Sequence, residues 1–463
     1  MPGRWILIAF MMIVGTSFTV LRTGTVHGQV AVRNQGYVPF SDAPILYLSD
    51  DLRDPVARLE KKLENGQTHL DWDPKGGYLQ SLLKNLQIPV SSQTLVFSKT
   101  SFQYKRISPQ TPRALYFNDD VYVGFVKNGP VLELVSFDPI KGAIFYLLRA
   151  QKHDQPRFER AELDCTQCHI GTGTRNVPGV LLRSAYVTPK GTLAEYAHTF
   201  TTGQESPLRE RWGGWYVTGT SGSQHHMGNV TVQDEAHPEV LDTTAGSNIT
   251  SLSALFDSSV YLSDQSDIVA HLVLGHQTQM HNLITLTSYK ARIALYEQAQ
   301  KGASWSQAAA EAQRQFEKPA EDLLRYLLFT NEAELSSPVA GSSGFQTEFE
   351  QLGPFDRRGR TLRDFDLHTR IFRYPCSYLI YSDDWDAIPE PAKSYIYHRL
   401  HQVLTGEDQG SDFSRLSPDD RKSILEILLE TKPDLPSEWR QSRKQNLHAK
   451  VGLGRRLAGL STN

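Results

Sequence analysis

Cysteine is scarce in this chain of 463 residues, which contains only three, an odd number. Exported domains that depend on disulfide bonds carry several pairs of cysteines, so three thiols exclude a disulfide framework. Cys165 and Cys168 are three positions apart, whereas Cys376 lies more than two hundred residues further along. The close pair therefore requires a chemical explanation of its own.

An excess of charge of one sign is also absent. Lysine and arginine total 48, aspartate and glutamate total 51, and the formal net charge is −3. A nucleic-acid-binding protein usually presents a strongly basic face, so we expect no nucleic-acid partner. The length is sufficient for more than one hydrophobic core, because single cores stop growing at about 250–300 residues.

Long hydrophobic runs are missing except at the start, where residues 5–14 are all apolar and follow Arg4. A charged residue, a short apolar run and a site with small residues, here Val26-His27-Gly28, are typical of a secretory signal. A membrane span needs about 20 apolar residues, so we favour a cleaved signal peptide at residues 1–28 over a retained anchor. We expect a periplasmic or otherwise extracytoplasmic protein with no transmembrane span after cleavage.

The close pair of cysteines belongs to the string Cys165-Thr166-Gln167-Cys168-His169. In a helix, positions i, i+3 and i+4 share one face, so both thiols and the imidazole can address one ligand. C-x-x-C-H is the signature of covalent c-type haem attachment, in which the two thiols add to the porphyrin and the histidine binds iron. Chance would produce this string in about one such chain in a thousand. We expect one covalent haem c at Cys165 and Cys168, with His169 as proximal ligand.

Three other interpretations of the cysteine pair are open. A zinc site needs about four ligands, and no second cysteine pair is present. A thioredoxin-like redox pair would open a helix after a strand, which the flanking sequence does not indicate. A surface disulfide would leave His169 unexplained. One motif also excludes the ordinary di-haem peroxidases.

The pattern of apolar residues predicts an α+β fold. Residues 44–86 show helical spacing in places, and residues 94–97, 114–117, 121–126, 131–135 and 143–147 read as strands of an antiparallel meander. Short strands are also expected at 181–187, 215–217 and 373–382. A helix begins near Asp264 or Ser266, a second is expected to begin at Pro319 and end at Phe329, and two more cover 393–404 and 418–429. We expect a β-rich N-terminal and central part with the haem-binding segment, then a mainly helical C-terminal part.

These patterns divide the chain into five segments. We assign residues 1–28 to the signal peptide, 29–155 to a mixed α/β region with the meander, 156–235 to the haem-binding region, 236–333 to a helical region and 334–463 to a mainly helical C-terminal region.

The other axial ligand of the iron decides between electron transfer and ligand chemistry. Met227 is the preferred distal candidate, because it follows two histidines in a loop rich in glycine and serine. His226 and His225 are alternatives in the same loop. Met280 and His276 are further alternatives on the predicted helix, although a methionine at this spacing more often packs in the hydrophobic core.

Arginines near the motif could pair with haem propionates, although ordinary surface charges are the simpler interpretation. They are Arg157, Arg160, Arg175 and Arg183. Arg209, Arg211, Trp212, Trp215 and Tyr216 form a basic and aromatic cluster, whose rings we expect in the core. Cys376 is expected to be a buried, inert thiol.

Several strings resemble a family of largely uncharacterised bacterial proteins that are labelled cytochrome c domain proteins. They are residues 91–100, 112–120, the C-T-Q-C-H motif at 165–169, residues 211–220, 226–229, 362–367 and 373–382. The resemblance covers most of the mature chain, and it implies export, haem binding and electron transfer. It includes the Met227 string, which favours Met227 as the distal ligand.

The leading hypothesis is thus an exported mono-haem c-type cytochrome that exchanges electrons with a partner protein of unknown identity. The alternative is a haem-dependent redox enzyme or a small-ligand sensor with an open distal site. The length of the chain favours this alternative, because it is much longer than a minimal electron carrier needs. No catalytic residues are assigned.

Overall fold

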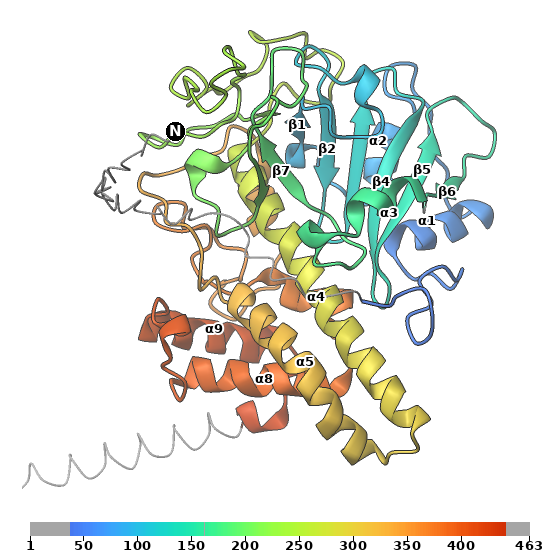
Figure 1. The fold of residues 1–463 in the computed structure, drawn as a ribbon, viewed down its shortest axis with the longest axis vertical. Coiled ribbons are helices and arrows are strands. Elements are labelled where there is room, and N and C mark those ends of the chain that lie inside the picture. The colour runs from blue at the N-terminus through green and yellow to red at the C-terminus, as the bar shows by residue number, and fades with distance from the viewer. Residues whose placement is uncertain (1–37, 162, 441–463) are drawn as a thin grey trace, which may run out of the picture.

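The computed structural model describes residues 38–161 and 163–440. The expected signal peptide at residues 1–28 lies outside these described residues. Within them the protein has the predicted α+β fold, with an antiparallel sheet in the N-terminal and central part and a mainly helical C-terminal part (Figure 1).

The main sheet has seven strands in the order β6-β5-β4-β3-β2-β1-β9. Its strands are β1 (Thr94–Val96), β2 (Arg113–Phe117), β3 (Val121–Val126), β4 (Val131–Asp138), β5 (Gly142–Arg149), β6 (Phe158–Arg160) and β9 (Trp215–Tyr216). From β1 to β6 each strand pairs antiparallel with the next, so the predicted meander is confirmed. The seventh strand, β9, pairs with β1. Strands β7 (Leu182–Ala185) and β8 (Thr199–Thr202) form a separate hairpin.

The turn between β2 and β3 has a clear sequence cause. The Asn118 side chain accepts hydrogen bonds from the backbone N–H groups of Asp120 and Val121, at 3.1 and 2.9 Å. Asparagine and aspartate favour turns because their short side chains bond the backbone two or three residues ahead. This turn also holds Asp119 and Asp120 at the end of the sheet.

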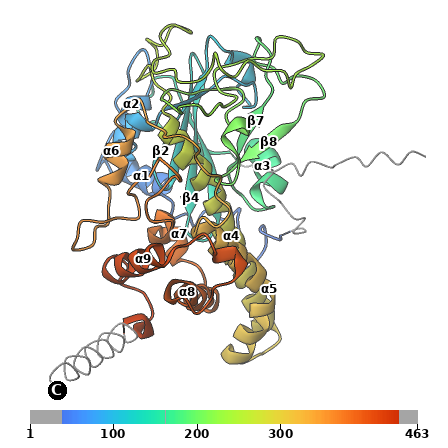
Figure 2. The ribbon, with the colours of Figure 1, turned by 90° about the vertical axis from the view of Figure 1, so that its left-hand side faces the viewer.

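Successive residues of a strand point to opposite faces, and the two faces of the main sheet are covered differently. On one face, Leu134 and Tyr146 pack in a hydrophobic cluster that includes residues of α1 (Pro55–Glu64) and α2 (Leu79–Asn85). On the other face, Phe137 and Phe145 join a cluster that includes the long helix α4 (Ile268–Gln300). Figure 2 shows α1 and α2 on one side of the sheet and α3, β7 and β8 on the other.

Helix α4 begins at its cap Asp267, whose carboxylate accepts the N–H groups of Val269 and Ala270. Its side chains are buried almost all round, because the sheet covers it on one side and later helices cover it on others. Helix α5 (Trp305–Leu327) packs along α4, and α8 (Glu390–Thr405) packs on α5, while α9 (Pro418–Thr431) packs on α8. The short helices α6 (Phe345–Glu350) and α7 (Asp383–Asp386) also contact α4.

Two predictions about the helical part were wrong. The helix assigned to begin at Pro319 begins instead at Trp305, with Ser304 and Gln307 forming a capping box, so Pro319 lies inside α5. Residues 373–382 do not form a strand, since Tyr378–Tyr381 is a 3₁₀ turn. A short apolar run has no periodicity that distinguishes a strand from other buried backbone, and Pro375 interrupts any ladder.

In the part of the chain that the structure describes, no helix combines the length and the apolar character that a bilayer span requires.

Candidate functional site

Helix α3 (Leu163–His169) carries the cysteine motif. Cys165 is half-buried and packs against the core on the α4 side of the sheet, whereas Cys168 is exposed. His169 ends the helix, and the helical spacing gives the two sulfur atoms and the imidazole a common face. The predicted grouping of these three residues on one helical turn is therefore present.

His169 has a defined ring orientation. Its Nδ1 lies 2.9 Å from the Gly179 carbonyl oxygen, and its ring centroid lies 5.0 Å from that of Phe145 on β5. A carbonyl oxygen only accepts hydrogen bonds, so Nδ1 carries the proton and Nε2 keeps its lone pair. A metal-binding histidine typically uses this arrangement, with the second nitrogen donating to a carbonyl or carboxylate.

The electrostatic surroundings keep His169 in its neutral form. Burial lowers the pKa of His169, the bond to Gly179 opposes this, and the positive charges of Arg113 and Arg183 lower the pKa further. A neutral imidazole is the form that can bind a metal ion.

The end of α3 is tied to the loop that follows. The His169 carbonyl accepts hydrogen bonds from the Gly179 N–H at 3.1 Å and from the Thr174 hydroxyl at 3.2 Å. A helix end leaves carbonyl groups without partners, and these two donors satisfy the last one. His169 and Gly179 thus exchange two hydrogen bonds, one through the ring and one through the backbone.

A cationic group that sequence analysis did not single out lies near His169. The Arg113 guanidinium packs over Gly124 of the neighbouring strand, where an added Cβ atom would come within 2.8 Å of it. It pairs with Glu133 at 2.6 Å, while its buried Nε has no partner among the described residues. Only the sheet register brings Arg113 to the site, because 56 positions separate it from His169.

The four arginines expected near the motif have different surroundings. Arg157 and Arg183 are exposed. Arg160 donates to the Ser49 and Tyr47 carbonyl groups and lies over the Tyr47 ring. Arg175 is buried, and its Nε has no partner among the described residues.

The cluster before the Met227 loop packs as expected. Trp212, Trp215 and Tyr216 are buried, and so is Arg211, which donates to the carbonyl groups of Ser206 and Gln204 at 2.7 and 2.9 Å. Arg209 has a side chain that is 68% exposed. The cluster is thus mainly part of the core.

The preferred distal candidate, Met227, is buried. Its sulfur accepts a hydrogen bond from the Ser184 hydroxyl of β7 at 3.7 Å, and its N–H donates to the Arg211 carbonyl at 3.0 Å. Ser184 and Arg183 are neighbours on a strand, so their side chains point to opposite faces. The Met227 sulfur therefore lies on the face of β7 opposite to the Arg183 side chain.

The two histidines of the same loop differ from each other. His225 is exposed, and its Nδ1 lies 3.2 Å from the Ser247 hydroxyl. His226 is buried against Trp212, and its Nδ1 accepts the Gly228 N–H at 3.1 Å. Burial lowers the pKa of His226 to about 4, so the ring is neutral and its proton is on Nε2. In this tautomer His226 offers no second lone pair to a metal.

The alternative distal ligands on α4, His276 and Met280, also have partners in the structure. Both ring nitrogens of His276 have partners, with Nδ1 2.6 Å from the Gln204 amide oxygen and Nε2 2.7 Å from the Ser377 hydroxyl. Met280 is fully buried in the hydrophobic cluster on the α4 side of the sheet. Cys376 is also fully buried, and burial raises the pKa of its thiol, as expected of an inert core cysteine.

No family model, curated protein or solved structure matches this chain. The likeness to cytochrome c domain proteins therefore stays a prediction, and the site has to be judged on its own geometry. Among the residues described, no three or more His, Cys, Asp or Glu side chains form a group that could hold a bare metal ion. A haem iron differs in this respect, since it takes only one or two axial ligands from the protein.

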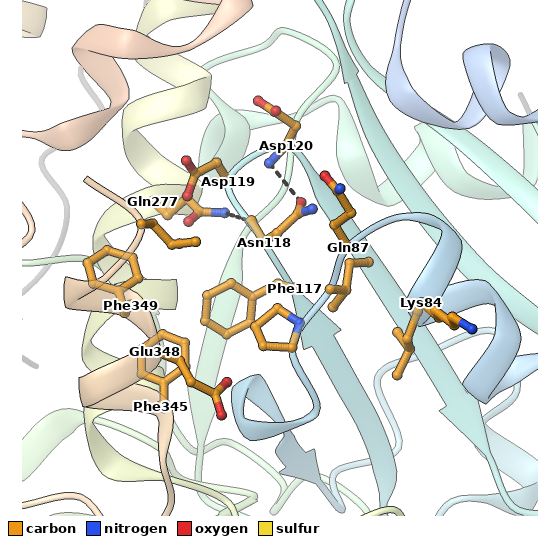
Figure 3. Close-up of a pocket in the computed structure, with 14 residues that line it drawn as sticks. Lys84, Gln87, Phe117, Asn118, Asp119, Asp120, Gln277, Phe345, Glu348 and Phe349 are labelled. Carbon is orange, nitrogen blue, oxygen red and sulfur yellow. Dashed lines mark hydrogen bonds between the residues drawn. The ribbon is translucent and has the colours of Figure 1, made fainter. Parts of the chain in front are cut away.

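A pocket of about 430 Å³ lies away from α3, between α2 and α6 at the turn after β2 (Figure 3). Phe117, Phe345 and Phe349 form its aromatic walls, and Asp119 and Asp120 lie at one end. Asp119 pairs with Arg363. The Gln277 amide nitrogen in this pocket already has partners, since it donates to the Asn118 carbonyl at 2.8 Å and to the Tyr122 hydroxyl at 2.8 Å.

Proposed function

We propose that this protein is a mono-haem c-type cytochrome, with haem held covalently by Cys165 and Cys168 and with His169 as the proximal iron ligand. The observation that carries the proposal is the hydrogen bond from Nδ1 of His169 to the Gly179 carbonyl at 2.9 Å. This bond fixes the tautomer that an axial ligand needs, at the histidine of a C-x-x-C-H motif. A thioredoxin-like or simple disulfide role for the cysteine pair gives no reason for it.

The surrounding residues fit a haem group. Cys168 is exposed and Cys165 is half-buried, so neither thiol is enclosed in the core and a haem could bind beside them. The sheet beside α3 offers the half-buried apolar side chains of Leu115 and Val135. Arg113, with its unpaired Nε, and Arg183 supply positive charge near His169 and would hold the propionates.

A bound haem supplies a one-electron couple at the iron, and its potential depends on the axial ligands and on nearby charge. In this chain the Gly179 carbonyl holds the proton on Nδ1 of His169 and so directs Nε2 away from the loop. Phe145 packs against the ring and limits its rotation. Electron exchange with a redox partner protein follows as the proposed role, in a periplasmic or other extracytoplasmic compartment.

On the distal side we retain Met227 as the proposed sixth ligand. It is buried, and its sulfur, a weak acceptor, takes one long hydrogen bond from the Ser184 hydroxyl at 3.7 Å. His276 is a weaker candidate because both of its nitrogens are engaged. His226 is a weaker candidate because its Nδ1 accepts a hydrogen bond from the Gly228 N–H.

A haem-dependent enzyme or a small-ligand sensor is the second candidate function. The position of Met227 favours it, because the sulfur lies beside Ser184, on the face of β7 opposite to Arg183, whose charge acts on His169. Carbon monoxide distinguishes the two functions. Rapid formation of an adduct with the reduced protein is expected of an open site, and a slow or absent reaction is expected of a six-coordinate carrier.

The attachment proposal is tested by producing the full chain in a bacterial host that exports proteins and attaches haem. We expect covalent haem on a denaturing gel and a c-type spectrum in the reduced protein. The C165S/C168S variant should lose the covalent stain, while C376S should keep it, because Cys376 is buried in the core. A wild-type chain without stain, or a double variant that keeps it, would refute the proposal.

A further inference from the structure

Helix α4 holds the loop that follows the cysteine motif with buried side chains, and Asn282 makes two of these hydrogen bonds. The Asn282 amide oxygen accepts the Val180 N–H at 3.2 Å, and its NH₂ group donates to the Val180 carbonyl at 2.7 Å. Asn282 is fully buried, in a segment of α4 where buried polar side chains alternate with apolar ones. Two hydrogen bonds from one rigid side chain hold the backbone of Val180 in both position and orientation.

The residue before Val180 is the partner of His169. Gly179 donates its N–H to the His169 carbonyl and accepts the proton of His169 Nδ1. Its Cα lies so close to α4 that an added Cβ would come within 2.0 Å of the Asn282 amide oxygen. Only glycine fits between the two side chains, so His169, Gly179 and Asn282 form one contiguous contact.

The other side of this segment is held by the sheet. The Pro178 carbonyl accepts the Ala143 N–H at 3.3 Å, at the start of β5. Residues 178–180 are therefore fixed between β5 and α4, and the Gly179 carbonyl has little freedom to move.

We propose that Asn282 is a positioning residue for His169: it fixes the carbonyl that orients the ring and sets how strongly Nε2 donates to iron. The proposal rests on the proposed haem function, and it adds a residue 113 positions from the motif. A hydrogen bond from Nδ1 to a carbonyl makes the ligating nitrogen more basic, and loss of such an outer partner typically costs about 10–100-fold in metal affinity or activity. More electron donation to the iron stabilises the oxidised form and lowers the reduction potential.

The same helix provides a matched control. Gln279 donates from its buried amide to the Gly173 carbonyl at 3.2 Å, in the same loop but not to Gly179 or Val180. The Q279A variant therefore removes a contact between α4 and the loop and keeps both hydrogen bonds between Asn282 and Val180. A purely structural role for α4 predicts similar effects from N282A and Q279A.

The first measurement needs no haem. In the full chain labelled with ¹⁵N-histidine, the signal that H169Q removes reports the His169 tautomer. We expect one tautomer, protonated at Nδ1, in the wild type and in Q279A, and a mixture of both tautomers in N282A. An unchanged tautomer in folded N282A overturns the proposal.

The second measurement uses the haem-loaded protein. We expect N282A to raise the reduction potential and to lower the frequency of the iron–histidine vibration in the reduced state, with Q279A close to wild type. Equal shifts in both variants overturn the proposal. If the wild type carries no haem, the haem function fails, whereas the tautomer measurement still decides the role of Asn282.

Gly179 gives a test that does not depend on N282A folding. The G179A variant places a methyl group against Asn282, so we expect the same mixture of tautomers even when α4 is unaltered. In the double variant G179A/N282A the methyl group has room, and the shift in potential should be smaller than the sum of the two single shifts. A wild-type tautomer in G179A, or strictly additive shifts, contradicts the inference.

Discussion

His281 of α4 and Asp384 of α7 form a buried ion pair, with Nδ1 2.8 Å from the carboxylate and the two side chains 0% and 5% exposed. The second ring nitrogen, Nε2, lies 2.7 Å from the Asp119 carbonyl oxygen. Both nitrogens thus face acceptors, so both carry protons and the ring is charged. His281 thus links α4 to α7 through Asp384 and to the turn between β2 and β3 through Asp119.

The charge on His281 predicts how stability depends on pH. Burial alone would lower the pKa of His281, but the carboxylates of Asp384 and Asp120 and the Asp119 carbonyl outweigh it and raise the pKa above 6.5. The stabilisation is therefore complete below pH 6.5 and is lost as pH rises through the higher folded pKa. Conversely, the pKa of Asp384 is lowered, so its contribution is lost as pH falls below 3.8.

Urea unfolding of wild type and H281Q checks this expectation. Removing one partner of a buried pair costs about 3–5 kcal/mol, so H281Q should be strongly destabilised at pH 6. The difference between the two proteins should shrink at high pH, where wild-type His281 loses its proton. A difference that does not change between pH 6 and pH 10 would mean that the ring is neutral.

Asp120, at the end of the pocket in Figure 3, should make stability depend on pH over a lower range than His281 does. Burial, with the nearby carboxylates of Asp119 and Asp384, raises its pKa to about 7 against the attraction of His281. The folded protein holds a proton there that the unfolded chain releases near pH 3.8, so this site loses stability between pH 4 and pH 7. We expect D120N to match wild type at pH 4 and to unfold at higher urea at pH 8.

The exposed Asp154 supplies the control for this substitution, because D154N removes a carboxylate of the same kind from the surface. Its unfolding midpoint should follow wild type at both pH values. Lower stability of D120N at pH 8 would show that the Asp120 carboxylate is a useful partner of His281 rather than a cost.

The distal ligand is tested by M227L, with M280L as the control for loss of a buried methionine. If Met227 binds iron, the oxidised protein has a long-wavelength methionine–iron absorption band, and M227L abolishes it while M280L keeps it. The reduced M227L protein should also bind carbon monoxide. A band that survives in M227L and disappears in M280L would make the α4 methionine the ligand.

The charge of Arg113 should tune the proposed haem. A positive charge near the iron favours the reduced state, so R113Q should lower the reduction potential. Restoring neutrality in R113Q/E133Q should return the potential part of the way, because Glu133 pairs with Arg113. R149Q removes an arginine whose side chain is 73% exposed, paired with Glu159, and should have little effect. A potential that responds equally to R113Q and R149Q would place Arg113 away from the haem.

Much of the fold was predictable from local patterns. The strands β2 to β5 are short runs rich in apolar residues, and turn residues separate β2 from β3 (Asn-Asp-Asp) and β3 from β4 (Asn-Gly), so strand and turn patterns predict the same meander. The extent of α5 was not predictable, because Pro319 at mid-helix imitates a first-turn proline. The partner of β9 was not predictable either, since it pairs with a strand 119 residues earlier.

For the candidate site, the sequence could supply only what is local. Cys165, Cys168 and His169 share one helical turn, and their spacing alone predicts their common face. Gly179, Asn282 and Arg113 reach the site by tertiary packing, which no spacing rule describes. One weak signal existed, because the Pro178-Gly179 pair is typical of a turn.

The outermost strands of the main sheet are its shortest members, with three residues in β6 and two in β9. An exposed edge strand offers unpaired backbone groups to other chains, and very short edges are one way in which proteins prevent such pairing. A neighbouring copy that approached either edge would find only a few backbone groups to bond. The main sheet is therefore a poor template for the addition of strands from another chain.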